Sequence, residues 1–98
     1  MPSKRRSPSE IAIEILDCIE EKGEATKWDL LKILGTGWQF HHWIEEFLLK
    51  ERFVEERKEA NHYFYRKTDA GNQFHELLRN GKMMRALMHM SGKRLRIA

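Results

Sequence analysis

The sequence predicts a mainly α-helical fold with one small β-hairpin, and three consecutive features support this prediction. Residues 26–34 form a short capped helix that ends at Gly35-Thr36-Gly37, and an aromatic-rich helix follows over residues 38–51. Residues 53–67 then read as a charged hairpin with a polar tip, before Thr68 begins a new helix. Helix, turn, helix, hairpin and helix is the order of a winged helix-turn-helix domain. In such a domain the second of the two turn-linked helices enters the DNA major groove.

The first helix is predicted to begin at Ser9, a suitable N-cap, and to end at Gly23, which can adopt a left-handed cap. Glu10 lies favourably at the positive end of this helix. One helix face is expected to be buried because apolar residues repeat on it at the spacing of a helix: Ile11, Ile15, Cys18 and Ile19. Cys18 is therefore interpreted as a small core residue and not as a reactive thiol.

The second helix is predicted to be capped by Thr26, with Asp29 three residues later completing a shortened capping box. Leu30, Leu31 and Leu34 are expected to face inward. The two glycines that follow fit a tight turn between two crossing helices.

The third helix is predicted to bury one face and to expose the other. The inward face comprises Phe40, Ile44, Phe47 and Leu48, with Trp43 at its edge. The outward face comprises Trp38, His42, Glu45 and Leu49, flanked by Gln39 and His41. Trp38 is expected to pack on the first or second helix, and the alternative is contact with a partner. The side chains at the start of the helix are the expected DNA base contacts: Trp38, Gln39, His41 and His42.

The two hairpin strands are predicted over residues 52–57 and 62–66, joined by a bend at residues 58–61. Tyr63 and Tyr65 should point to one face, and His62, Phe64 and Arg66 to the other. Basic side chains on the hairpin can reach a phosphate backbone. The alternative interpretation is ordinary cross-strand charge pairing with Glu55, Glu56 and Glu59.

The last helix, capped by Thr68, carries a heptad-like apolar seam. Once the first three helices are packed, no partner within the chain is expected for so long a seam, so it is predicted to pair with a second subunit. The predicted homodimer interface is Phe74, Leu77, Leu78, Gly81, Met84, Leu87 and Met88. The alternative is that the helix ends at Asn80-Gly81. The chain is thus divided into a basic tail (1–8), a winged helix-turn-helix domain (9–72), a dimerisation helix (73–91) and a second basic tail (92–98).

The net charge of +3 is unevenly distributed, because the tails are basic and the body between them is acidic. Basic charge placed on a hairpin and on tails favours binding to nucleic acid more than the overall charge does. The expected phosphate contacts are Lys4, Arg5, Arg6, Lys27, Arg57, Lys58, His62, Arg66, Lys93, Arg94 and Arg96. Glu45, Glu46 and Glu51 would repel phosphates, so only the first half of the third helix is expected to dock.

Several classes of function are disfavoured. A single cysteine allows no internal disulfide and fits a reducing compartment, and no apolar run is long enough for a membrane span. No metal-ligand spacing, phosphate-binding glycine loop or nucleophile signature is present, so neither a cofactor nor a metal nor a small-molecule substrate is expected, and an enzyme is improbable. The chain is interpreted as an intracellular, cytoplasmic, nucleoid-associated protein.

Three segments carry a resemblance to a known family. These are the helix capped by Thr26, the run over residues 43–54 into the first strand, and residues 65–71 between the second strand and the last helix. Through them, the chain from Ser9 to about Met90 resembles the small archaeal winged helix-turn-helix DNA-binding proteins that dimerise through a C-terminal antiparallel coiled coil. The resemblance implies duplex-DNA binding as a regulator or chromatin-type protein, and related forms occur in archaeal viruses and plasmids.

Two residues depart from the pattern of this family. Arg52 stands where the family usually has glycine, and it would cost roughly 1 kcal/mol if the left-handed conformation is kept. Lys67 stands where the family usually has an apolar residue.

The sequence therefore favours a dimeric DNA-binding protein, most simply a transcriptional regulator with the third helix in the major groove. Two alternatives stay open: a winged-helix module for protein–protein assembly, and a sequence-independent architectural chromatin protein. The acidic body and Glu45-Glu46 favour the assembly module, whereas the basic hairpin and tails favour DNA.

Overall fold

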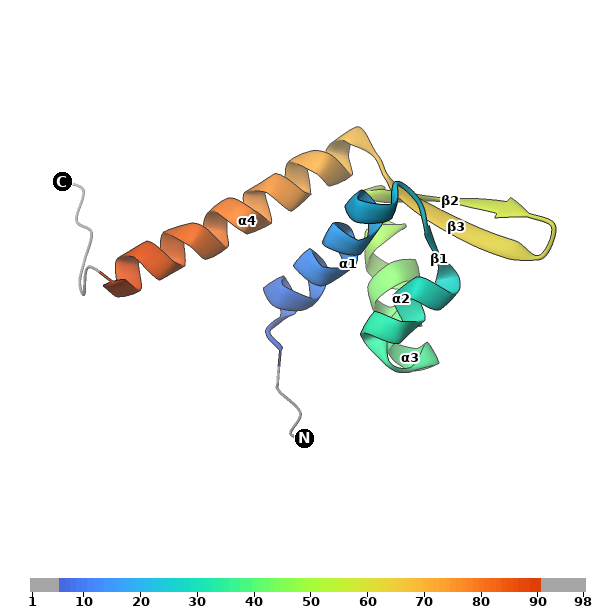
Figure 1. The fold of residues 1–98 in the computed structure, drawn as a ribbon, viewed down its shortest axis with the longest axis horizontal. Coiled ribbons are helices and arrows are strands. Elements are labelled where there is room, and N and C mark those ends of the chain that lie inside the picture. The colour runs from blue at the N-terminus through green and yellow to red at the C-terminus, as the bar shows by residue number, and fades with distance from the viewer. Residues whose placement is uncertain (1–5, 91–98) are drawn as a thin grey trace.

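The computed structural model describes the backbone of residues 6–90 and the side chains of residues 6–81. It is mainly helical with a small three-stranded antiparallel sheet, which confirms the expected balance of helix and strand. The elements in order are α1 (Pro8–Lys22), β1 (Ala25–Thr26), α2 (Lys27–Leu34), α3 (Gly37–Phe40), the π-helix η1 (His41–Leu48), β2 (Val54–Glu59), β3 (His62–Lys67) and α4 (Asp69–Met90). The β2–β3 hairpin and α4 leave the helical body in opposite directions (Figure 1).

α1 begins earlier than the sequence indicated, so the prediction of Ser9 as its N-cap was wrong. Ser7 is the cap: its Oγ accepts from the Glu10 amide at 3.2 Å, and its own amide donates to the Glu10 carboxylate at 2.9 Å. Pro8 has no amide hydrogen to lose and its fixed φ suits the first helical position, which explains the earlier start.

The buried face of α1 is also slightly rotated from the predicted stripe. Ile15 and Ile19 are buried as expected, but Ala12 and Leu16 are buried with them. Ile11 and Cys18 are only partly buried against this core. Burial nevertheless raises the pKa of the Cys18 thiol, which is consistent with a packing role.

The capping box of α2 is confirmed. Thr26 Oγ1 accepts from the Asp29 amide at 3.1 Å, and the Thr26 amide donates to Asp29 at 3.0 Å. Leu30 and Leu34 are buried, whereas Leu31 is only partly buried. β1 was not predicted from the sequence; it pairs with β3 in the register Ala25↔Tyr65 and Thr26↔Phe64. A strand of two residues is too short to produce a recognisable alternation.

The third helix is not a regular α-helix, because α3 continues directly into η1. The Leu49 amide donates to the carbonyl of Ile44 at 2.8 Å, five residues earlier, as in a π-helix. The wider turn keeps every fourth residue on one face, and the buried residues are Phe40, Ile44 and Leu48. Leu49, predicted to face outward, is instead partly buried against this core.

The hairpin has different bounds from those predicted: β2 begins two residues later and extends to Glu59, while β3 begins at His62 as predicted and continues to Lys67, so the turn has only two residues. Glu59 pairs with His62 across Ala60-Asn61, and Ala60 adopts a left-handed φ of 59°. The face predicted for Tyr65 is correct: this side chain points into the core, where its ring meets the Phe40 ring edge-on at 5.9 Å. Its hydroxyl donates to Glu56 at 2.7 Å, which satisfies the one polar atom that the ring would otherwise bury.

The junction between the hairpin and α4 is tightly bonded. Arg52 adopts a left-handed φ of 62°, so the strain expected for arginine at this position is present. The Arg52 carbonyl accepts from Thr68 Oγ1 at 2.7 Å, and the Phe53 carbonyl accepts from the Thr68 amide at 3.1 Å. Thr68 Oγ1 also caps α4 by accepting from the Gly71 amide at 3.0 Å. Gly71 lies so close to Phe53 that an added Cβ would be 1.9 Å from the Phe53 carbonyl oxygen.

The first turns of α4 belong to the core of this chain, which corrects part of the predicted dimer seam. Phe74 stacks on Phe53 with ring centroids 4.2 Å apart, and Phe47 meets the pair edge-on. Leu78 also packs against the core. Phe74 and Leu78 therefore have packing partners within the chain.

The rest of the predicted seam lies on or beyond the exposed part of α4. Leu77 is 67% exposed, and Gly81 is also exposed. The helix continues through Asn80-Gly81 to Met90, but the side chains of Met84, Leu87 and Met88 lie outside those that the structure describes. None of the helices over residues 6–90 combines the length and apolar character needed to cross a bilayer.

Candidate nucleic-acid interface

The outward side of α3 presents an exposed aromatic pair. Thr36 Oγ1 accepts from the Gln39 amide at 3.1 Å and so caps the helix start. Trp38 is 68% exposed, so the expectation that it packs on the first or second helix was wrong. Its ring instead stacks on His42, one turn along the same helix, with centroids 5.4 Å apart and an interplanar angle of 4°. The pair forms a flat aromatic surface at the beginning of the helix.

His41 interacts with two carboxylates on its own helix. Its Nδ1 lies 2.7 Å from Glu45, and its Nε2 lies 3.3 Å from Glu46. The hydrogen bond to Glu45 raises the pKa of His41, with the charge of Glu46 acting in the same direction. A protonated His41 offsets part of the negative charge that would repel DNA here, but it is less available as a base contact than His42.

The two hairpin arginines are held by carboxylates. Arg57 makes a forked pair with Glu24, at 3.1 Å from Nε and 2.8 Å from Nη2, and it also contacts Glu59. These hydrogen bonds raise the pKa of Arg57. Arg66 pairs with Glu55 at 2.9 Å. Cross-strand pairing, the alternative considered from the sequence, thus describes Arg66–Glu55, whereas Arg57 and Glu59 pair within β2.

The lysines of this region, unlike the arginines, lie over aromatic rings. Lys27 lies over the Phe40 and Tyr63 rings at 5.2 and 5.8 Å, and Lys58 lies over the Tyr63 ring at 5.5 Å. Within the part of the chain that the structure describes, neither lysine pairs with a carboxylate. His62 is exposed beside the hairpin turn. These three residues therefore keep their positive or polar ends available to a partner.

The predicted phosphate contacts of the tails are largely outside the described residues, namely Lys4, Arg5, Lys93, Arg94 and Arg96. Arg6 is described, and it docks on the helical body. It pairs with Glu14 and donates to the Ile33 carbonyl at 3.1 Å. The structure therefore does not bring Arg6 together with the hairpin lysines.

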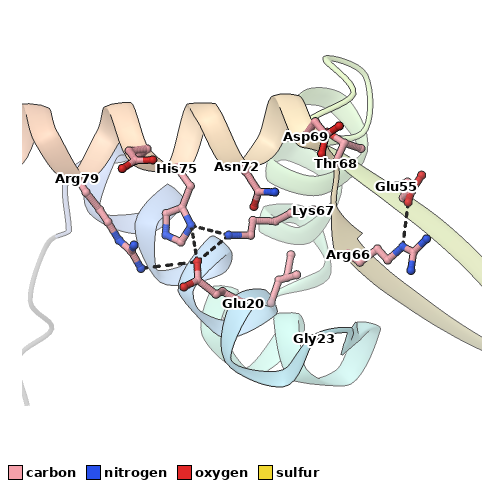
Figure 2. A pocket seen from close by; sticks show the side chains of 12 residues that line it. Glu20, Gly23, Glu55, Arg66, Lys67, Thr68, Asp69, Asn72, His75 and Arg79 are labelled. Atoms are coloured by element: carbon pink, nitrogen blue, oxygen red, sulfur yellow. Dashed lines mark hydrogen bonds and ion pairs between the residues drawn. The ribbon is translucent and has the colours of Figure 1, made fainter.

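A polar cluster that the sequence did not predict lies between α1 and α4, with only its centre buried. At its centre, His75 is only 1% exposed (Figure 2). Its Nδ1 lies 2.9 Å from Lys67 Nζ, and its Nε2 lies 2.7 Å from Asp17 Oδ1. Glu20 accepts from Lys67 at 2.7 Å, and Arg79 donates to Asp17 at 2.9 Å. The cluster lines a polar hollow of about 870 Å³ on the surface.

The hydrogen bonds of this cluster define the protonation state of His75. A lysine ammonium can only donate, so Nδ1 accepts from Lys67 and Nε2 carries the proton given to Asp17. Burial lowers the pKa of His75, and the charges of Lys67 and Arg79 act in the same direction against the opposing effect of Asp17. A neutral imidazole therefore joins α1, the end of β3 and α4. The departure of Lys67 from the apolar residue typical of the resembled family is explained by this cluster.

The remaining polar groups do not suggest a metal centre. Over the described residues, no three histidine, cysteine, aspartate or glutamate side chains gather to hold a metal ion. This surface thus has an exposed aromatic pair on a capped helix. Lysines without a carboxylate partner among the described residues lie beside the hairpin, and on the opposite face of the hairpin the arginines are neutralised by carboxylates. Comparison with protein-family models, curated proteins and solved structures finds no match for the chain.

Proposed function

We propose that this protein is a dimeric duplex-DNA-binding regulator with a winged helix-turn-helix domain. The observation that carries the proposal is the capped start of α3, which follows a glycine turn from α2 and presents the Trp38–His42 pair outward. In helix-turn-helix proteins the first residues of the second helix contact base edges. The β2–β3 hairpin that follows corresponds to a wing, and its free lysine can contact a phosphate.

The base-reading role falls to Gln39 and His42 and the phosphate role to Lys58. Glutamine matches the N6/N7 edge of adenine, and histidine can donate to guanine. On a preferred site, Gln39→Ala or His42→Ala should cost roughly 1–3 kcal/mol, with little change on random duplex. Lys58→Ala should weaken both and lower the slope of log affinity against log salt by about 1. The measurement is fluorescence anisotropy at several salt concentrations, after selection of a preferred site from random DNA.

Arg57→Ala is the matched control for Lys58→Ala, since the two residues are neighbours on β2. Arg57 is already held by Glu24 and Glu59, so its loss should change the salt slope less than the loss of Lys58. Intact preferred-site affinity in both Gln39→Ala and His42→Ala, together with lost binding in Lys58→Ala, would show that α3 is not the reader.

The proposed dimer uses the C-terminal part of α4. Replacing Met84 and Met88 together by glutamate should convert dimers to monomers in sedimentation, because charge placed in an apolar seam is costly to bury. The control is Lys82→Glu with Ala86→Glu, which adds charge to the same helix away from the seam and should leave the dimer intact. A wild-type protein that sediments as a monomer at micromolar concentration contradicts the pairing.

One observation favours a second candidate, a winged-helix module for protein assembly. Arg57, Arg66 and His41 are all compensated by carboxylates, which reduces the positive field that a DNA-binding surface needs. Binding to random duplex at two salt concentrations separates the candidates, because DNA binding must weaken steeply with salt.

A further inference from the structure

A small groove is lined by residues at the start of α2 and by residues 61–63 of the β2–β3 hairpin. Its volume is about 260 Å³. Pockets that enclose drug-sized ligands usually measure about 300–1,000 Å³, so this groove suits a single flat group. The groove is lined by Thr26, Lys27, Trp28, Leu31, Asn61, His62 and Tyr63.

The groove offers an aromatic surface that the fold does not use. Trp28 is 67% exposed although it lines the groove, and Leu31 and Tyr63 are only partly buried beside it. Trp28 differs in this from Trp43, whose ring packs against Phe47. An indole left open at the edge of a groove can stack on a planar ligand with little rearrangement.

The charge around the groove is positive. Lys27 and Lys58 both lie over the Tyr63 ring, and none of the residues that line the groove is acidic. On the opposite face of the hairpin, Glu55 and Glu59 neutralise Arg66 and Arg57. The groove is therefore lined by basic and uncharged side chains, and the carboxylate on the Lys58 face of β2, Glu56, is held by the Tyr65 hydroxyl, so the groove favours an anionic occupant.

We propose that this groove binds an unpaired nucleobase of a single-stranded nucleic acid, with the base on Trp28 and the flanking phosphates on Lys27 and Lys58. A positive groove with aromatic stacking surfaces is the arrangement that binds single strands without sequence preference. A base within a duplex cannot reach the groove, because both of its faces are already stacked. The site adds to the proposed duplex-binding function and does not require α3 to enter a major groove.

The test compares a fluorescein-labelled oligothymidylate with the same backbone lacking its bases. Trp28→Ala should weaken binding to the oligothymidylate on the order of 10-fold to 100-fold and leave binding to the abasic strand and to duplex unchanged. Trp28→Phe should recover most of the lost affinity, because phenylalanine retains a stacking face. Since Trp28 is exposed, the alanine variant should keep the wild-type thermal transition, which confirms that any loss is local.

The lysines are tested by the salt dependence of the same binding. Lys27→Gln combined with Lys58→Gln should lower the single-strand salt slope by about 1.4, at roughly 0.7 for each lost phosphate contact. Lys32→Gln combined with Lys50→Gln is the matched control, since both lysines are exposed and neither lines the groove.

The outcomes distinguish this site from the proposed function. Equal affinity for the abasic and base-containing strands, or unchanged affinity in Trp28→Ala, overturns the base-stacking site whether or not duplex is bound. Duplex binding that depends on Gln39, without any single-strand binding, overturns the groove alone. Single-strand binding that depends on Trp28, without any duplex binding, supports the groove and overturns the duplex-binding regulator.

Discussion

Replacing Gly71 by alanine should destabilise the fold by about 3 kcal/mol, near the upper end of the usual cost of overpacking. The added Cβ would lie 1.9 Å from the Phe53 carbonyl oxygen and 2.9 Å from its carbonyl carbon. These are backbone atoms, and the same carbonyl accepts from the Thr68 amide, so the neighbour cannot move without breaking the junction. Urea unfolding followed by circular dichroism measures the change.

Helix propensity alone predicts the opposite sign, because alanine is favoured over glycine by about 1 kcal/mol within a helix. Gly81→Ala is the matched control on the same helix, where an added Cβ meets nothing within 4 Å. It should stabilise the protein by about 1 kcal/mol. A stabilising Gly71→Ala would show that the start of α4 is not held against Phe53.

Replacing His75 by alanine should cost about 3 kcal/mol at pH 8, because it removes a buried ring and leaves a cavity beside unsatisfied polar groups. The ring bonds Asp17 of α1 and Lys67 at the end of β3, so both contacts are lost with it. His62→Ala is the control, since His62 is exposed beside the hairpin turn and its loss should leave stability unchanged. Urea unfolding at fixed pH measures both variants.

The contribution of His75 should depend on pH with a defined sign. Its pKa is lowered in the folded state, so the unfolded chain binds a proton first as pH falls. The contribution is fully present above about pH 6.5, the ordinary value for histidine, and is lost as pH falls through the lower folded pKa. Burial is the largest cause of the lowered pKa, and a proton added to Nδ1 would also face the Lys67 ammonium. The stability difference between wild type and His75→Ala should therefore shrink below about pH 6.5.

The pH dependence of this stability difference distinguishes the contribution of His75 from the contributions of the acidic groups of the cluster. The hydrogen bonds from Arg79 and His75 hold the pKa of Asp17 below its usual value against the effect of its burial, and Lys67 does the same for Glu20. Their contributions are lost in a more acidic window, near or below about pH 4. A wild-type advantage that stays constant from pH 8 to pH 5 would contradict a neutral His75 in the fold.

The sequence predicted well those elements whose local chemistry determines them. Thr26 with Asp29, and Thr68 before the last helix, cap helices through contacts three residues away, which any reader of the chain can locate. The starting residue of α1 was misplaced because two serines flank Pro8. The π-helix and β1 were missed since a hydrogen bond shifted by one residue leaves no mark on composition, and two residues cannot show alternation.

The candidate site was less predictable because its charges are paired over long distances in the chain. Glu24 holds Arg57 from 33 residues away, and Asp17 holds His75 from 58 residues away. The exposure of Trp28 was equally hard to predict, because the spacing of residues alone cannot distinguish an exposed tryptophan from a packed one. The predictions for Gln39, His42 and the dimer seam stay predictions. A signal was nevertheless present in Lys67, a charged residue where the resembled family has an apolar one.

The hydrogen-bonded junction between Phe53, Thr68 and Gly71 fixes where α4 begins, so α4 can act as a spacer of fixed length. The helix contains 22 residues, and at a rise of about 1.5 Å per residue it is roughly 33 Å long. Because its origin is held against the hairpin, its direction relative to α3 cannot vary freely. If two copies pair along α4, the separation of the two α3 helices depends on this length together with the overlap of the paired helices. Operator half-sites lie about 34–36 Å apart for each turn of DNA, so the length of α4 would limit which half-site spacings the dimer can span.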